Sequence, residues 1–136
     1  MNPNKLFPLV ITDKLDETKA YYTGKAGFVV TFENDNYLQV RYGDDEARPE
    51  LAFMRPSGDT PMGPTVPFTG QGLIVSVPTK DADDKHTAMR GHGAKILSEP
   101  SDKPWGWRSF TAVDPNGVIL DFFHESAQSS IADATG

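Results

Sequence analysis

The stretch WGWRSFTAVDPNGVILDFF, residues 105–123, carries the clearest structural signal in this chain. Two segments rich in β-branched and aromatic residues flank Asp114-Pro115-Asn116-Gly117, which is a composition typical of a β-hairpin. Proline presets φ at the second turn position, and Asn-Gly supplies residues that tolerate positive φ. We therefore predict strands over Trp107–Val113 and Val118–His124, joined by a tight turn.

Length and composition limit the possible classes of protein. The chain has 136 residues, with 13 Lys and Arg against 19 Asp and Glu, and a net charge of -6. This length predicts one domain, and the acidic balance disfavours nucleic acid, whose binding depends on neutralising phosphates. The sequence has no cysteine, which excludes disulfides, thiolate metal sites and a cysteine nucleophile. Without a long apolar run or a signal-peptide core, we expect a soluble cytoplasmic protein that binds no membrane.

The chain divides into two halves with the same order of elements. In the first half, the pattern predicts a helix that is capped by Asp13 or Asp16, ends near Lys25 and buries Leu15, Thr18 and Tyr22. It also predicts the strands Leu6–Thr12, Phe28–Glu33, Tyr37–Tyr42 and Glu50–Arg55. In the second half, it predicts a helix from about Asp81 to Arg90 and the strands Leu73–Val77, Ala94–Leu97, Trp107–Val113 and Val118–His124. We expect a first module over about 5–55, a Pro- and Gly-rich linker over 56–70, a second module over about 71–125 and a polar tail over 126–136.

Each half has the order βαβββ, and this repetition predicts an α+β fold. Gly27 and Gly93 occupy equivalent positions after the two helices, and Glu50 and Asp121 occupy equivalent positions in the last strands. A βαβββ module leaves one sheet face uncovered, so we expect two modules to pair into a cupped, barrel-like mixed sheet with the helices outside. Because pockets form where modules meet, the concave side is the expected ligand site.

Alternation along the strands predicts which side chains face that concave side. The apolar members of each strand should pack under the helices, which leaves the cavity to Tyr37, Gln39, Arg41, Glu50, Asp121 and Phe123. Two carboxylates, those of Glu50 and Asp121, are thereby expected on the concave side. Salt-bridging residues on a solvated sheet face would give the same pattern, so both carboxylates can also be structural.

Several short motifs occur in the order and spacing of a known family. They are Thr18-Lys19-Ala20-Tyr21-Tyr22 before Gly27-Phe28, Asp81-Ala82-Asp83 at the second helix, Gly93-Ala94, and the segment from Trp105 to the Asp-Pro-Asn-Gly turn. Through these motifs the chain, from about Leu6 to Glu125, resembles the glyoxalase/bleomycin-resistance/dioxygenase superfamily, also called vicinal oxygen chelate proteins. The resemblance implies the paired βαβββ fold and a homodimer.

The resemblance also bears on metal binding. Metal-dependent members carry a histidine in the first strand of one or both modules and a carboxylate in the fourth strand of each. In this chain the histidine positions fall at Phe7 and Gly72, and the carboxylate positions at Glu50 and at Asp121, where the family usually has a glutamate. Two carboxylates without an imidazole are a poor ligand set for zinc, iron or nickel, so we expect no metal and no other cofactor. The histidines of the chain fall elsewhere, at His86, His92 and His124.

Without a metal site, the feature that the sequence predicts for ligand binding is an aromatic, hydrogen-bonding cleft. Trp105, Trp107 and Arg108 are expected at its border, and Phe7 and Phe123 at its floor. Trp rings stack on planar ligands and accept cations on their faces, while an arginine can hold a carboxylate or pair with an acid of the cavity. These features resemble the metal-free bleomycin-resistance branch, whose dimers sequester flat, often cationic antibiotics. Alternatively, the tryptophans pack under the linker and Arg108 only neutralises a nearby acid.

We therefore predict a protein that binds and sequesters a planar or cationic small molecule, such as an antibiotic, without catalytic residues. The first alternative is a lyase, isomerase or dioxygenase-like enzyme in which Glu50 and Asp121 hold an atypical metal or act as general acid and base. The second alternative is a structural or regulatory protein whose cup is filled by its own side chains.

Overall fold

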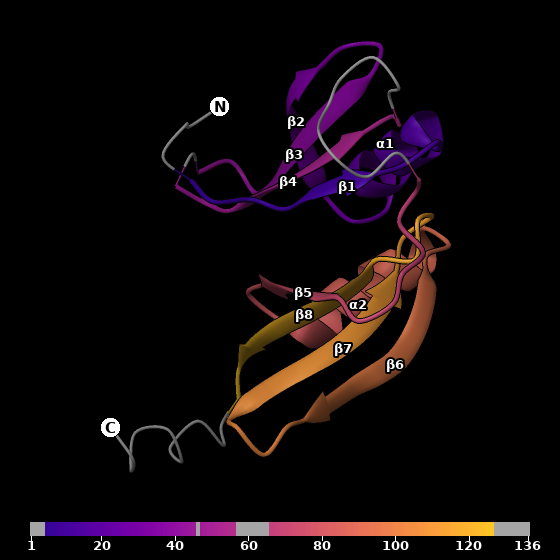
Figure 1. Ribbon diagram of the computed structural model, residues 1–136. Helices are drawn as coiled ribbons and strands as arrows, with labels where there is room; N and C mark the ends of the chain where they lie inside the picture. Colours follow the sequence, from indigo (N-terminus) through magenta and orange to yellow (C-terminus); the bar gives the residue numbers. More distant parts are fainter. Residues whose placement is uncertain (1–4, 46, 57–65, 127–136) are drawn as a thin grey trace. The chain divides into compact units, whose positions relative to one another are not determined.

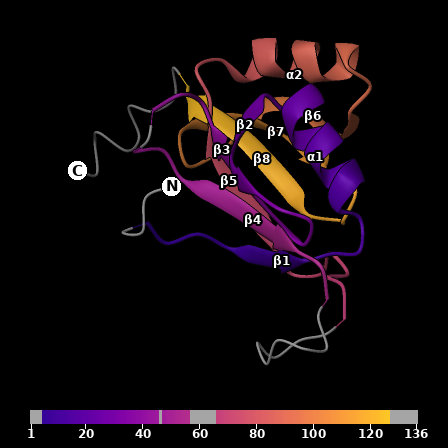
Figure 2. The same ribbon diagram turned by 90° about the horizontal axis from the view of Figure 1, so that it is seen from above.

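The computed structural model describes residues 5–45, 47–56 and 66–126. These residues form two compact units, one up to Gln71 together with Pro115–Gly117, the other over Gly72–Asp114 and from Val118 onward. Most of the predicted linker and of the predicted tail, residues 57–65 and 127–136, lies outside the described residues. The elements of both units are labelled in Figure 1 and seen from above in Figure 2.

The first unit is a four-stranded sheet with one helix. In chain order it contains β1 (Leu9–Ile11), α1 (Leu15–Gly24), β2 (Phe28–Glu33), β3 (Tyr37–Tyr42) and β4 (Glu50–Met54). The strand order is β1-β4-β3-β2, with β1 parallel to β4 and the other pairs antiparallel. The helix packs against β2 and β3, and it buries the predicted stripe together with a further tyrosine: Leu15, Thr18, Tyr21 and Tyr22.

Aromatic rings fill the space between α1 and its sheet. Tyr22 is fully buried, and its ring centroid lies 5.0 Å from those of both Phe28 and Phe53. Full burial of an apolar side chain of this size contributes about 1.5 to 3 kcal/mol. This cluster therefore fixes the helix on one face of the sheet.

The second unit repeats the plan of the first. It contains β5 (Ile74–Pro78), α2 (Ala82–Gly91), β6 (Lys95–Asp102), β7 (Trp107–Val113) and β8 (Ile119–Glu125). The strand order β5-β8-β7-β6 and the parallel pairing of β5 with β8 match the first sheet. Gly27 and Gly93, which follow the two helices, both have a φ of 80°. The prediction of two βαβββ modules with mixed sheets in an α+β fold is confirmed.

The two sheets are separate four-stranded sheets and do not close into one barrel. Within the described ranges, β1 and β2 are the edges of the first sheet, and β5 and β6 are the edges of the second. The repeated pattern specifies each module, whereas closure depends on pairing between edge strands, which the pattern does not encode.

The two helices begin in different ways. As predicted, α2 starts directly after Asp81, whose carboxylate accepts hydrogen bonds from two N–H groups of the first turn at 2.9 and 3.1 Å. By contrast, α1 starts after Lys14 without a side-chain cap, so the predicted capping by Asp13 or Asp16 is wrong. The hydroxyl of Thr12 accepts the N–H of Lys14 at 2.9 Å instead, and Asp16 lies inside the first turn.

Strand β6 is longer than the predicted segment Ala94–Leu97. The strand includes Pro100, although proline has no N–H to donate to a sheet. However, β6 is an edge strand, and its register with β7 shifts between Ile96 and Ser98 and again between Ser98 and Ser101. Such irregular edge strands accommodate proline.

The turn Asp114-Pro115-Asn116-Gly117 closes a hairpin between β7 and β8. The N–H of Asp114 donates to the carbonyl of Val118 at 2.9 Å, and the N–H of Val118 donates to the Asp114 carboxylate at 2.8 Å. Gly117 has a φ of 85°, whereas no described residue other than glycine has a positive φ. Of the pair Asn116-Gly117, only the glycine therefore adopts a backbone conformation with positive φ.

Asn116 contributes hydrogen bonds within the first unit instead. Its amide donates to the hydroxyl of Thr18 at 2.8 Å and accepts from the hydroxyl of Thr12. Because Thr12 follows β1 and Thr18 lies in α1, Asn116 connects the end of that strand to the helix.

A close backbone approach between Gly70 and Gly117 generates the first testable prediction. Both have positive φ, and a Cβ at Gly70 would lie 2.6 Å from the Gly117 carbonyl oxygen. We predict that Gly70→Ala lowers the free energy of unfolding by about 2 kcal/mol or more, because left-handed strain adds to this clash. Urea denaturation followed by circular dichroism measures the loss.

The matched control is Gly72→Ala. Gly72 has a φ of 79°, but a Cβ there would meet nothing within 4 Å. This variant should lose only about 1 kcal/mol, the cost of the backbone conformation alone. Equal losses in the two variants would contradict the predicted clash.

Candidate functional site

The predicted cavity residues of the first module share the sheet face that is turned away from α1. The register of β3 and β4 pairs Arg41 with Glu50 and Gln39 with Ala52, which puts these side chains on one face. Tyr37 belongs to the same face by alternation. We call this surface the polar face and define it by Lys5, Thr31, Tyr37, Gln39, Arg41 and Glu50.

Glu50 is the centre of the polar face. Its side chain is only 1% exposed, and it pairs with Lys5 Nζ at 2.7 Å. It also accepts hydrogen bonds from Thr31 Oγ1 at 2.7 Å and from Gln39 Nε2 at 2.9 Å. Burial alone would raise the pKa of Glu50, but these donors and the lysine charge together hold it below its usual value. Glu50 is therefore ionised at neutral pH and poorly suited to act as a general base.

A chain of hydrogen bonds continues from Glu50 along β3. The Tyr37 hydroxyl donates to Gln39 Oε1 at 2.6 Å, and the Gln39 amide donates to Glu50. Burial, together with the nearby Glu50 charge, raises the pKa of Tyr37, so the hydroxyl remains a proton donor. Each partner fixes the orientation of the next, and the polar face is consequently a rigid, internally satisfied network.

Arg41 and Phe7 are the remaining predicted site residues of the first unit. The Arg41 guanidinium donates to the carbonyls of Gly43 and Asp44 at 3.0 and 3.2 Å, rather than to the Glu50 carboxylate. Its positive charge is thus not neutralised by the central carboxylate. Phe7 lies half-buried just before β1.

In the second unit, the sheet face turned away from α2 carries an aromatic pair and a carboxylate. Trp107 and Phe123 stack with ring centroids 3.8 Å apart and 12° between their planes. Asp121 pairs in register with Thr111 and with Ser76, whose hydroxyl donates to its carboxylate at 3.1 Å. All three predicted residues are half-buried. We call this surface the aromatic face and define it by Ser76, Trp107, Thr111, Asp121 and Phe123.

Arg108 lies on the opposite side of the second sheet. Its guanidinium donates to the Asp83 carboxylate of α2 at 2.8 and 3.0 Å and to Asp102 at 3.4 Å. The charged hydrogen bonds from Arg108 lower the pKa of Asp83. Of the alternatives for Arg108, pairing with the cavity acid Asp121 does not occur, because Arg108 and its strand neighbour Trp107 point to opposite faces of the sheet. Trp105 lies before β7 and is 57% exposed.

Three partners of the predicted carboxylates were not expected from the sequence. Lys5 and Thr31 bind Glu50, and Ser76 binds Asp121. Strand alternation gives a weak signal for Ser76, since it lies opposite Asp121 once β5 and β8 are aligned. Nothing in the pattern marks Lys5, which precedes the first strand.

The metal site implied by the family resemblance does not fit these residues. In the described part of the chain, no group of three or more His, Asp or Glu residues is placed to hold a metal ion. The oxygens of Glu50 are already used by Lys5 and two neutral donors. The histidines are engaged elsewhere: His124 Nδ1 accepts the N–H of Ala82 at 2.8 Å, His86 contacts Glu99, and His92 ends α2.

Comparison with protein families gives one match over most of the chain. The family model of the Glyoxalase/Bleomycin resistance protein/Dioxygenase superfamily matches residues 6–122. A comparison with curated proteins gives no match. Within the described ranges, no helix is long and apolar enough to cross a membrane.

Several solved structures share the fold. A glyoxalase/bleomycin resistance protein/dioxygenase from Nocardioides has a TM-score of 0.69 at 20% identity, covering 92% of this chain and 85% of its own. A bleomycin resistance determinant encoded on the transposon Tn5 has a TM-score of 0.64 at 19% identity, covering 90% and 98%. TnmS3, an antibiotic binding protein from Streptomyces sp. CB03234, has a TM-score of 0.70 at 20% identity, covering 93% and 99%. At such low identities these likenesses show the fold alone.

The buried pair of Lys5 and Glu50 predicts a pH-dependent loss of stability on mutation. We expect Glu50→Gln to lower the free energy of unfolding at pH 7 by about 2 to 4 kcal/mol, because Lys5 loses its counter-ion. The pKa of Glu50 is lower in the folded chain than in the unfolded chain, where it is about 4.3. Its contribution is therefore present above that pH and disappears as the pH falls through the folded-state pKa.

Urea denaturation between pH 7 and pH 3 measures this difference. The difference in free energy between wild type and Glu50→Gln should narrow as the pH falls below the unfolded-state pKa. Glu33→Gln is the matched control, because Glu33 forms an exposed ion pair with Lys19 at 2.9 Å, and it should lose less than about 1 kcal/mol. A difference between wild type and Glu50→Gln that stays constant from pH 7 to pH 3 would refute the assignment.

Proposed function

Because the chain belongs to the Glyoxalase/Bleomycin resistance protein/Dioxygenase superfamily, we propose that it binds and sequesters a planar or cationic small molecule, such as an antibiotic, without a metal. The observation that carries this proposal is the stacked pair of Trp107 and Phe123 beside Asp121. As part of the proposal, the protein acts as a homodimer in the cytoplasm.

The aromatic pair offers a surface for a flat ring. A ligand that extends the stack gains about 0.5 to 1.5 kcal/mol per ring pair beyond the area that it buries. A cation over the Trp107 ring gains about 0.5 to 2 kcal/mol. In the part of the chain that the structure describes, the indole N–H of Trp107 makes no hydrogen bond and is available to an acceptor on the ligand.

Asp121 adds a charge to this surface. Among the described residues its carboxylate receives one side-chain hydrogen bond, from Ser76 at 3.1 Å, and forms no ion pair. A carboxylate accepts several donors, so Asp121 retains acceptor capacity for an ammonium or amidine group. The net charge of -6 favours the approach of a cation.

Two structural relatives support the same class of function. The Tn5 protein is a bleomycin resistance determinant, and TnmS3 is an antibiotic binding protein. Sequestration requires affinity alone, so a face without catalytic groups is sufficient. An enzyme that uses Glu50 as general base is disfavoured by the lowered pKa and the saturated hydrogen bonds of that carboxylate.

Two planar probes with the same ring system but different charge test the roles of stacking and charge. 9-Aminoacridine is a planar cation at neutral pH, and acridine is its neutral counterpart. We predict that Trp107→Leu weakens the binding of both by about tenfold or more, because the stacking surface is lost. Asp121→Asn should weaken only 9-aminoacridine, since only this probe carries the charge. Isothermal titration calorimetry on chelator-treated protein measures the dissociation constants.

The matched control is Phe32→Leu, which removes an aromatic ring that is 43% exposed in the first unit. Its affinities should equal those of wild type. Titration of Trp105→Leu, which keeps Trp107 as its single tryptophan, should show fluorescence quenching by 9-aminoacridine. The proposal fails if neither probe binds, or if Trp107→Leu binds both probes as tightly as wild type.

A further inference from the structure

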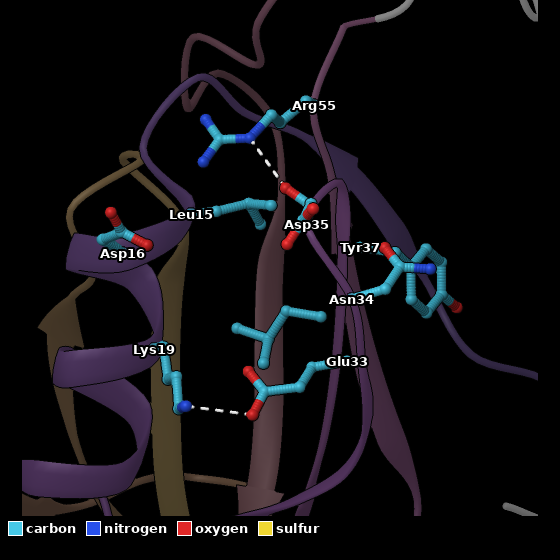
Figure 3. Close-up of a pocket in the computed structure, with 9 residues that line it drawn as sticks. Leu15, Asp16, Lys19, Glu33, Asn34, Asp35, Tyr37 and Arg55 are labelled. Atoms are coloured by element: carbon cyan, nitrogen blue, oxygen red, sulfur yellow. Dashed lines mark hydrogen bonds and ion pairs between the residues drawn. The ribbon is translucent and has the colours of Figure 1, made fainter.

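A pocket of about 370 Å³ lies in the first unit between α1 and the turn that joins β2 to β3 (Figure 3). Its lining residues come from the start of α1, from that turn and from the end of β4: Leu15, Asp16, Lys19, Glu33, Asn34, Asp35, Tyr37, Leu38 and Arg55. The ring of Tyr37 points away from the pocket in Figure 3, toward the polar face where its hydroxyl binds Gln39. The pocket is thus distinct from both the polar face and the aromatic face.

Charges of both signs surround an apolar floor in this pocket. Leu38 is 2% exposed and Leu15 is 6% exposed, so both are packed against the core and offer only a small apolar surface. The Lys19 ammonium and the Glu33 carboxylate pair at 2.9 Å across the space between α1 and β2, as Figure 3 shows. This ion pair closes one end of the pocket and neutralises its own two charges.

Arg55 supplies an anchored cation at the other end. Its Nε donates to the backbone carbonyl of Asp35 at 3.0 Å, and its own backbone N–H donates to the carbonyl of Asn36 at 2.9 Å. Within the described ranges, the two terminal nitrogens of the guanidinium have no hydrogen-bond partner. A guanidinium held at Nε with its terminal nitrogens available is arranged for a carboxylate.

Asp16 supplies the complementary charge. Its carboxylate lies on α1, on the side of the pocket opposite the Asp35 turn (Figure 3), and in the described part of the chain it forms no hydrogen bond or ion pair. Carboxylates outnumber cations around the pocket, which disfavours a ligand with several negative charges, such as a phosphate. A ligand that carries one carboxylate and one ammonium group offers a partner to each of these two charged groups, Arg55 and Asp16.

From this geometry we propose that the pocket binds a free α-amino acid with an aliphatic side chain. The ligand carboxylate accepts hydrogen bonds from the terminal nitrogens of Arg55, and its ammonium group donates to Asp16. The aliphatic side chain lies on Leu15 and Leu38. This site and its ligand are independent of the planar compound proposed for the aromatic face.

Three probes of nearly equal size separate the two charges. L-Leucine carries both, L-leucinamide lacks the carboxylate, and 4-methylpentanoate lacks the ammonium group. Titrations of the ¹⁵N-labelled full chain followed by NMR should give a dissociation constant for leucine that is about tenfold lower than for either of the other probes. The shifted signals should belong to Asp16, Glu33, Asp35 and Arg55.

Two variants assign the charges to residues. Arg55→Met should weaken leucine about tenfold or more and leave leucinamide unchanged, whereas Asp16→Asn should weaken leucine and leave 4-methylpentanoate unchanged. Asp16 is exposed and on a helix surface, so its variant keeps the test valid even where Arg55→Met impairs folding. Arg55→Lys retains the positive charge but not the paired N–H donors of the guanidinium, so its affinity for leucine should lie between those of Arg55→Met and wild type.

The controls are Asp13→Asn, an exposed acid outside the pocket, and Trp107→Leu on the aromatic face. Both should bind leucine as wild type does, so that failure of this proposal and failure of the proposed function remain distinguishable. Absence of leucine-induced shifts at these residues overturns the proposal. Equal affinities for all three probes overturn it as well.

Discussion

In the part of the chain that the structure describes, each unit has one helix for a four-stranded sheet, and one helix covers only one face of such a sheet. Strand alternation then sorts the side chains into two sets. Apolar residues such as Val40 and Phe53 in the first unit, and Phe110 and Leu120 in the second, are fully buried. The other set occupies the face turned away from the helix. All the candidate chemistry described for Glu50 and Asp121 follows from this division.

The two units place a carboxylate on the uncovered sheet face but surround it with different side chains. In the first, burial of Glu50 is compensated by Lys5, Thr31 and Gln39, which leaves the carboxylate ionised and its hydrogen-bonding capacity used. In the second, Asp121 keeps acceptor capacity beside the half-buried stack of Trp107 and Phe123. The repeat is therefore one of topology, and the equivalent carboxylates have unequal roles. The first contributes stability, and the second is the proposed ligand contact.

The sequence predicts well those strands in which apolar and polar residues alternate strongly. Such alternation indicates both that the segment is a strand and which side chains share a face. Trp107–Val113 agrees with the structure at both ends. Features that depend on tertiary contacts could not be predicted from the sequence. The length of β6 depends on its position at a sheet edge, and the partner of Arg108 is an acid of α2 whose nearness the local sequence does not encode. The ion pair of Lys5 likewise joins residues that no local pattern relates.

Native mass spectrometry of chelator-treated protein, mixed with 9-aminoacridine and no added metal, is the decisive test of metal-free binding at the aromatic face. We expect a stoichiometric mass increment equal to the organic ligand alone, and the loss of that increment in Trp107→Leu. A ligand adduct that forms only after a divalent ion is added would contradict metal-free binding. A stoichiometric ion retained through chelation would contradict it equally, and Glu50 and Asp121 would then be the first residues to replace.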